Sequence, residues 1–184
     1  MFSYSVLSRT IDIKKVPIMK EGQRYAAVSL LIDAEMNLLM IQRPKHIGDP
    51  WSGHMAFPGG KVEKNETATE AAIREAEEEI GILSNEIEVC GYLDTYETGT
   101  GFRILPVVAF VKEKFTKKIN KLEVDELFEV PLEFILDSDN HVLKSGFWNG
   151  AVRHYYTINY FDYNIWGATA GMLVNLFDRI KSNA

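Results

Sequence analysis

The 184-residue chain has little of what marks secreted, membrane-spanning or multidomain proteins. Cys90 is its only cysteine, which excludes an internal disulfide and a thiolate metal cage and favours a reducing compartment. The most apolar stretches, residues 25–32 and 104–111, are near half the length that a membrane helix requires. The N-terminus has no basic start followed by an apolar run, so we expect no signal peptide and a cytoplasmic protein without membrane contact.

The composition indicates one folded domain. Hydrophobic residues make up 46% of the chain and the formal net charge is −6, which excludes a disordered protein. The negative charge and a pI near 5.3 argue against binding to nucleic acid through bulk charge. No linker rich in Gly, Ser or Pro divides the chain. We therefore expect one domain over residues 21–184, preceded by an arm without clear periodicity over residues 1–20.

Hydrophobic periodicity predicts more strands than helices. A capped helix is expected at residues 66–80, where Gly81 ends it, and an amphipathic helix at residues 164–181. Residues 44–60 hold three Pro and four Gly, which predicts a long loop with at most a short strand at 55–57. Strands are predicted at residues 24–33, 38–42, 87–97, 102–113, 126–130 and 151–160, with a helical turn at 131–136. Because helices do not separate the strands one by one, the pattern predicts an α+β fold with a mixed central sheet flanked by helices.

The predicted helix at residues 66–80 carries a cluster of carboxylates. Glu75, Glu78 and Glu79 stand at i, i+3 and i+4, so their side chains are neighbours beside a stripe of small apolar residues. Three carboxylates this close repel one another unless a cation lies among them, and Mg²⁺ prefers oxygen ligands. Taken alone, the run is more typical of a solvated acidic helix face.

The residues around this run favour the metal site instead. Residues 60–82 read GKVEKNETATEAAIREAEEEIGI, which resembles the Nudix box G-x5-E-x7-R-E-U-x-E-E-x-G-U, where U is a bulky aliphatic residue. Ala76 departs from this pattern, and its place on the apolar stripe should affect packing alone. The matching positions are Gly60, Glu66, Arg74, Glu75, Glu78, Glu79, Gly81 and Ile82. The resemblance implies a Nudix-like α/β/α sandwich.

The resemblance also implies a divalent metal site on this helix. Glu75, Glu78 and Glu79 would hold Mg²⁺ or Mn²⁺ together with the carbonyl of Gly60. The Gly59-Gly60 pair would let the backbone approach the site closely. The metal would bridge the oxygens of a substrate diphosphate and lower the pKa of a bound water.

Catalytic roles are also implied by the resemblance. Glu75 is the first candidate for the general base. Glu123, Asp125 and Glu126 on a later loop are the alternatives, although an exposed loop charge is the more common interpretation of each one singly. Arg74 would orient a carboxylate through a bidentate pair, and Glu66 and Glu75 are both candidate partners. For Arg74 and Glu66 a purely structural ion pair agrees equally well with the pattern.

Three further segments resemble the coenzyme A pyrophosphatase branch of the family. They are GHMAFPGG at residues 53–60, TGFRILPVV at residues 100–108 and IWGATA at residues 165–170. One part of the branch pattern is missing, because Asp49 stands where the branch has a second arginine after the one that Arg43 matches. This departure weakens the assignment of the substrate.

Candidate substrate-binding residues lie in the long loop and at its ends. Arg43 and Lys45 could contact phosphate, and Trp51 could stack on a base or fill the loop. His54 is more often a satisfied loop histidine than a ligand, and Phe57 is more often a core residue.

The sequence therefore predicts a metal-dependent pyrophosphohydrolase of a small nucleotide substrate, with coenzyme A or its thioesters as one candidate. ADP-ribose or a nucleotide sugar is the main alternative within this reaction class. A non-catalytic module that senses a nucleotide is the alternative from another class. A homodimer is implied by the resemblance alone.

Overall fold

The computed structural model describes residues 18–48, 51–112, 115–148 and 150–182, with the exception of the side chain at position 148. Most of the predicted arm at residues 1–20 lies outside this part of the chain. The order of elements is β1 (Arg24–Ile32), β2 (Asn37–Gln42), β3 (Met55–Ala56), β4 (Gly59–Lys61), α2 (Ala68–Ile80), η1 (Ser84–Glu86), β5 (Ile87–Tyr92), β6 (Tyr96–Glu97), β7 (Phe102–Val111), β8 (Glu126–Pro131), α3 (Leu132–Ile135), η2 (Ser138–Asn140), β9 (Val142–Trp148), β10 (Ala151–Tyr160), β11 (Tyr163–Trp166) and α4 (Gly167–Ser182).

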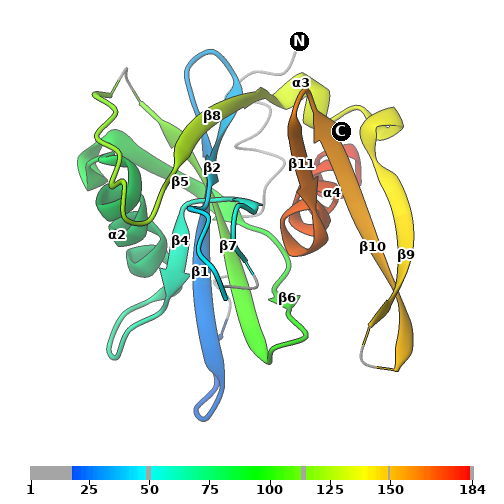
Figure 1. Cartoon of the computed structure of the whole chain (residues 1–184). Helices are drawn as coiled ribbons and strands as arrows, with labels where there is room; N and C mark the ends of the chain where they lie inside the picture. Colours follow the sequence, from blue (N-terminus) through cyan, green and yellow to red (C-terminus); the bar gives the residue numbers. More distant parts are fainter. Residues whose placement is uncertain (1–17, 49–50, 113–114, 149, 183–184) are drawn as a thin grey trace.

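A mixed sheet forms the centre of the molecule (Figure 1). Its main path runs β3-β2-β1-β7-β5, and β4, β6 and β8 pair with β1, β7 and β2 respectively. The β1–β7 pair is parallel and the other pairs are antiparallel, so the prediction of a mixed sheet is confirmed. Most of β1 and β7 is buried, as expected for parallel strands that are covered on both faces.

Helix α2 covers one face of this sheet. Thr67 caps its first turn through a reciprocal pair with Glu70, and Gly81 ends it in the left-handed conformation at φ 81°. The helix therefore begins at Ala68, two residues later than predicted, and Glu66 lies before it. The small size of its buried alanines lets the helix approach the sheet closely, and the Ser29 hydroxyl on β1 donates to the Ala72 carbonyl at 2.6 Å.

The opposite face is covered by α4 and a separate three-stranded sheet in the order β11-β10-β9 (Figure 1). The sequence predicted only β10 of these strands. Residues 164–166, predicted as the start of the last helix, belong to β11, because Gly167 at φ 63° turns the chain before α4 begins. The layers are thus α2, the central sheet, and α4 with the small sheet, which confirms the predicted sandwich.

One other predicted strand is corrected. The strand expected at residues 87–97 is divided into β5 and β6, with a register shift between Val89 and Gly91 on β5.

Cys90 lies in this stretch and is buried, and burial raises the pKa of its thiol to about 12. In the part of the chain that the structure describes, no helix is long and apolar enough to cross a membrane.

Candidate metal centre and substrate pocket

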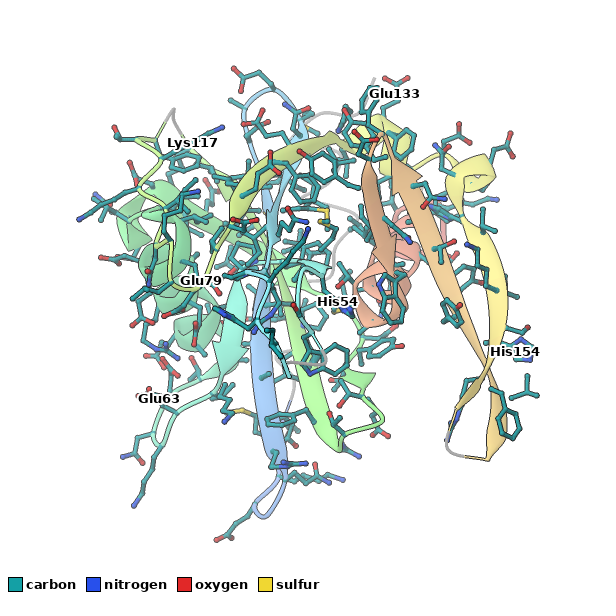
Figure 2. All side chains as sticks on the ribbon, in the orientation of Figure 1. His54, Glu63, Glu79, Lys117, Glu133 and His154 are labelled. Carbon is teal, nitrogen blue, oxygen red and sulfur yellow. The ribbon has the colours of Figure 1, made fainter. Side chains whose placement is uncertain are left out.

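Three carboxylates from two segments meet on the side of the central sheet that α2 covers. Glu75 and Glu79 come from α2 and Glu123 from the loop before β8, and each offers an oxygen within 4.8 Å of the others. Glu79 is 3% exposed, whereas Glu123 is exposed to solvent. Figure 2 shows Glu79 between α2 and the strand that carries Gly60. The cluster is therefore buried at Glu79 and open to solvent at Glu123.

The loop that carries Glu123 is fastened to the end of α2. The backbone N–H of Lys118 donates to the carbonyl of Ile80 at 3.1 Å, and the N–H of Asn120 donates to the carbonyl of Glu79 at 2.9 Å. Asn120 also accepts from the N–H of Glu123 at 3.0 Å. These bonds bring a carboxylate that is 44 positions beyond Glu79 into the same cluster. The sequence predicts Glu123 only as a candidate base and not as a metal ligand. Asn120, three residues earlier, favours a turn and is the one local signal in the sequence for the position of Glu123.

Two glycines on β4 line the other side of the cluster. The N–H of Gly59 donates to Oε2 of Glu79 at 3.0 Å. A Cβ atom on Gly60 would lie 2.2 Å from Oε1 of Glu75, and one on Gly59 would lie 2.4 Å from the carbonyl oxygen of Ala27. Glycine at position 60 therefore lets β4 lie close to the Glu75 carboxylate, and glycine at position 59 lets it lie close to the backbone of β1.

Arg74 joins the acidic residues into one network. Its Nε and Nη2 donate to the two oxygens of Glu66 at 2.8 and 3.2 Å, and its Nη1 donates to Glu75 at 2.9 Å and Glu78 at 3.1 Å. Nη2 also donates to the Lys61 carbonyl at 3.1 Å, which ties α2 to β4. The hydrogen bonds from Arg74 are the main reason why the pKa of Glu66 is lowered. The guanidinium thus fixes the position of Glu75.

Burial makes the cluster unfavourable for negative charge. The pKa of Glu79 is raised to about 8, chiefly by burial and also by the neighbouring carboxylates Glu75 and Glu123, although the hydrogen bond from the Gly59 N–H lowers it. Burial also raises the pKa of Glu75, against the lowering effect of Arg74. Buried carboxylate oxygens held this close together are suited to a hard divalent cation, whose charge would stabilise their ionised form.

Other acidic residues considered from the sequence lie apart from this cluster. The carboxylate of Glu78 contacts Arg74 and is about half exposed, at 52%. Glu126 is on β8, pairs with Gln42, and accepts a hydrogen bond from the Tyr163 hydroxyl at 3.0 Å. The structure therefore brings Glu123 to the cluster and places Glu126 between the central and the small sheet.

A pocket of about 340 Å³ adjoins the glycine side of this centre. Its walls include residues from all three segments that resemble the coenzyme A branch, at residues 53–60, 100–108 and 165–170, together with residues of β1 and others nearby. Figure 2 shows His54, one of these residues, on the side of the central sheet that faces α4. Of the predicted substrate residues, four line the pocket: Arg43, Trp51, His54 and Phe57.

Aromatic side chains form much of the pocket wall. The His54 ring makes edge contacts with Trp51 at 5.6 Å and Trp166 at 4.7 Å between ring centroids. Phe57 lines the pocket but is 3% exposed and belongs to the core. Lys45 does not line it, and its aliphatic stem lies against Gly53. The departure at Asp49 lies outside the described residues.

Fold and site together define an α+β domain with a glycine-lined carboxylate cluster next to an aromatic pocket. A family model, the NUDIX domain, matches residues 22–144. The uncharacterized Nudix hydrolase NudL of Yersinia enterocolitica is 31% identical over 160 residues, covering 84% of this chain and 79% of that protein. The mitochondrial Nudix hydrolase 15 of Arabidopsis thaliana is 32% identical over 176 residues, covering 86% of this chain and 60% of that protein.

The chain belongs to the Nudix family of hydrolases. A crystal structure of a MutT/nudix family protein from Enterococcus faecalis shares the fold, with a TM-score of 0.56 at 17% identity over 92% of this chain and 66% of that chain. Nudix hydrolases cleave pyrophosphate bonds of small nucleotide substrates and generally use divalent metals. A relative is named as mitochondrial, so the cytoplasmic location stays a prediction.

Proposed function

We propose that the chain is a Mg²⁺-dependent pyrophosphohydrolase that cleaves the diphosphate of a nucleoside diphosphate linked to another moiety. Coenzyme A or a coenzyme A thioester is the leading candidate substrate. The observation that carries the proposal is the position of the pocket. It joins the Gly59-Gly60 wall of the carboxylate cluster to the three segments that resemble the coenzyme A branch. A diphosphate at the glycine wall would leave its organic ends in the aromatic pocket.

Glu75, Glu79 and Glu123 would hold the metal, with the Gly60 carbonyl as a further ligand. Mn²⁺ could replace Mg²⁺, because both prefer oxygen donors. The bound metal would neutralise the diphosphate and lower the pKa of a water molecule. Glu78 would join the ligands only if its carboxylate moved away from Arg74, which it contacts at 3.1 Å.

Arg74 is a positioning residue in this proposal. It holds Glu75 at 2.9 Å while its other nitrogens are fixed by Glu66. Glu75 would accept the proton from the attacking water, because it is the carboxylate that the network holds most firmly beside Gly60. Water adds to one phosphorus, the bond from the bridging oxygen to that phosphorus breaks, and each half of the substrate leaves with one phosphate of the former diphosphate as a phosphate monoester.

Within the pocket, Trp51 and His54 would contact a ring or the apolar arm of the substrate. Arg43 would contact a phosphate. Lys45 stays a weaker candidate because its stem lies against Gly53, outside the pocket wall.

A substrate panel tests the proposal directly. Purified protein with Mg²⁺ is assayed against coenzyme A, ADP-ribose, NADH, dinucleoside polyphosphates and 8-oxo-dGTP. Release of 3′,5′-ADP from coenzyme A supports the substrate, and a Trp51→Ala variant should raise KM more than it lowers kcat. If ADP-ribose or a nucleotide sugar is turned over efficiently and coenzyme A is not, that compound replaces coenzyme A as the assigned substrate. Nucleotide binding without turnover of any substrate would favour a sensing module.

A further inference from the structure

Within the described part of the chain, no strand pairs with the outer edge of β9. β9 is the last strand in the order β11-β10-β9, and it pairs only with β10 among the described residues. In Figure 1 it is the outermost strand on its side of the molecule, with β10 and β11 between it and the central sheet. Its backbone groups on that edge are a template for another strand.

β9 has almost none of the features that keep such edges from pairing. Lys144 is the only charged residue in its sequence, VLKSGFW, and there is no proline. The ladder with β10 runs through seven consecutive residue pairs, from Val142↔Thr157 to Trp148↔Ala151, without a shift in register. An edge strand of this length without a bulge, a proline or several charges pairs readily with another strand.

The same edge carries exposed apolar side chains. Leu143 is 57% exposed and Phe147 75% exposed, and their alternate spacing puts them on one face. Val152 on β10 lies opposite Phe147 and is 62% exposed. Farther along β10, Ile158 on this face is fully buried. The core-facing side of the small sheet therefore continues beyond the core as an exposed surface, in which Leu143 and Phe147 flank the hydrogen-bonded pair of Ser145 and His154.

We propose that β9 pairs antiparallel with β9 of a second copy of this chain, about a two-fold axis at Ser145. Such an axis gives an isologous interface in which each contact occurs twice. In this register Leu143 of each copy lies opposite Phe147 of the other, and Lys144 lies opposite Gly146. The two small sheets become one continuous sheet.

The sequence of the strand itself favours a second copy of the chain as its partner. The Ser145 register joins apolar to apolar residues and places no like charges opposite one another, since Lys144 faces a glycine. Opposite side chains in an antiparallel pair lie about 4.5–5.5 Å apart, so Leu143 and Phe147 would be in contact. A strand pair alone buries less surface than a standard interface, so a reversible dimer of modest affinity is expected.

This inference is independent of the proposed function. The pocket contacts the small sheet through Trp166 on β11, the strand farthest from the β9 edge. Turnover can fail while the dimer forms, and the dimer can fail while turnover is normal.

Sedimentation equilibrium over a concentration series tests the register. The wild-type chain should dimerise reversibly. Leu143→Lys and Phe147→Glu should each weaken dimerisation about tenfold or more, because each variant disrupts two symmetry-related apolar pairs. The variant with both substitutions places opposite charges across the axis and should recover most of the lost affinity.

Matched controls change similar residues away from the edge. Phe161→Glu alters an 86% exposed aromatic in the β10–β11 turn, and Leu83→Lys alters a 49% exposed leucine before η1. Both should dimerise like the wild type, and circular dichroism should show all variants folded. A wild type that stays monomeric up to hundreds of micromolar overturns the proposal. So does a dimer that neither β9 variant weakens, and failure of the double variant to recover overturns the Ser145 register.

Discussion

The carboxyl-terminal half of α2 and the hairpin of β9 and β10 use acidic and apolar residues in opposite ways. In α2 one charged side chain lies in the interior, since Glu79 is 3% exposed although it carries a carboxylate. In the hairpin the apolar side chains are left outside, and Phe147 is 75% exposed. Each region breaks the ordinary rule of burial, and such exceptions mark places where a protein binds something.

The difference predicts separable consequences. Substitutions in the carboxylate cluster should affect chemistry while the fold persists. Substitutions at the hairpin edge should affect neither chemistry nor stability of the single chain. Variants of the two regions should therefore differ in kcat, in the free energy of unfolding, or in neither.

Glu75→Gln should have the largest effect. The amide keeps the size of the side chain but neither accepts a proton nor contributes charge to a metal site, so kcat should fall roughly 10²–10⁴-fold. Glu77→Gln on the exposed face of the same helix is the matched control and should keep kcat near wild type. Steady-state kinetics on the best substrate of the panel measures both. Equal losses in the two variants would contradict the assignment.

Gly60→Ala should reduce turnover about 10²-fold, because its methyl group would lie 2.2 Å from Glu75 Oε1 and displace that carboxylate. Gly99→Ala adds the same methyl group where no atom lies within 4 Å, and it serves as the control. Activity assays with a thermal melt distinguish displacement from unfolding. A fully active Gly60→Ala variant would show that Glu75 need not occupy this position.

Glu79 should make the metal-free protein less stable as pH rises. Its pKa is about 8 in the folded chain against an ordinary value of 4.5, so between these pH values the folded chain holds a proton that the unfolded chain has released. The free energy of unfolding should therefore decrease between pH 4.5 and pH 8. Above pH 8, titration of Glu79 should change it little.

Urea midpoints measured in a chelator at several pH values test this dependence. Glu79→Gln should remove this contribution, and saturating Mg²⁺ should oppose it by favouring the ionised carboxylate. An identical pH slope in the wild type and the variant would rule out Glu79 as the source.

Val152→Thr should have the smallest effect. Its side chain is 62% exposed, so the free energy of unfolding should change by less than about 0.5 kcal/mol. Ile80→Ala in the buried end of α2 should cost about 2–5 kcal/mol in the same urea measurement. Comparable losses would mean that the hairpin is better packed than its exposure indicates.

The same two regions differ in how well the sequence predicts them. The sequence of α2 contains its own cap, its alanine stripe and its terminal glycine, so the helix was predicted within two residues. Residues 142–148 contain a Lys-Ser-Gly interruption and no alternation of polar and apolar residues, and β9 was not predicted. The strand depends on its pairing with β10, which is a contact between segments.

The candidate site follows the same distinction. The box residues on α2 and β4 could be located from their spacing, because they are local in sequence. The approach of Glu123 could not, since it depends on backbone bonds from Lys118 and Asn120 to the end of α2. The contact of Trp166 with His54 likewise joins segments that are more than a hundred residues apart.

The buried thiol of Cys90 gives the molecule a practical property. With a pKa of about 12 and 2% exposure, it should react slowly with maleimides or iodoacetamide while the chain is folded. A cysteine introduced at an exposed position would then carry the one thiol that these reagents label readily. Spectroscopic probes could be attached to the hairpin or to the pocket rim without first removing the natural cysteine.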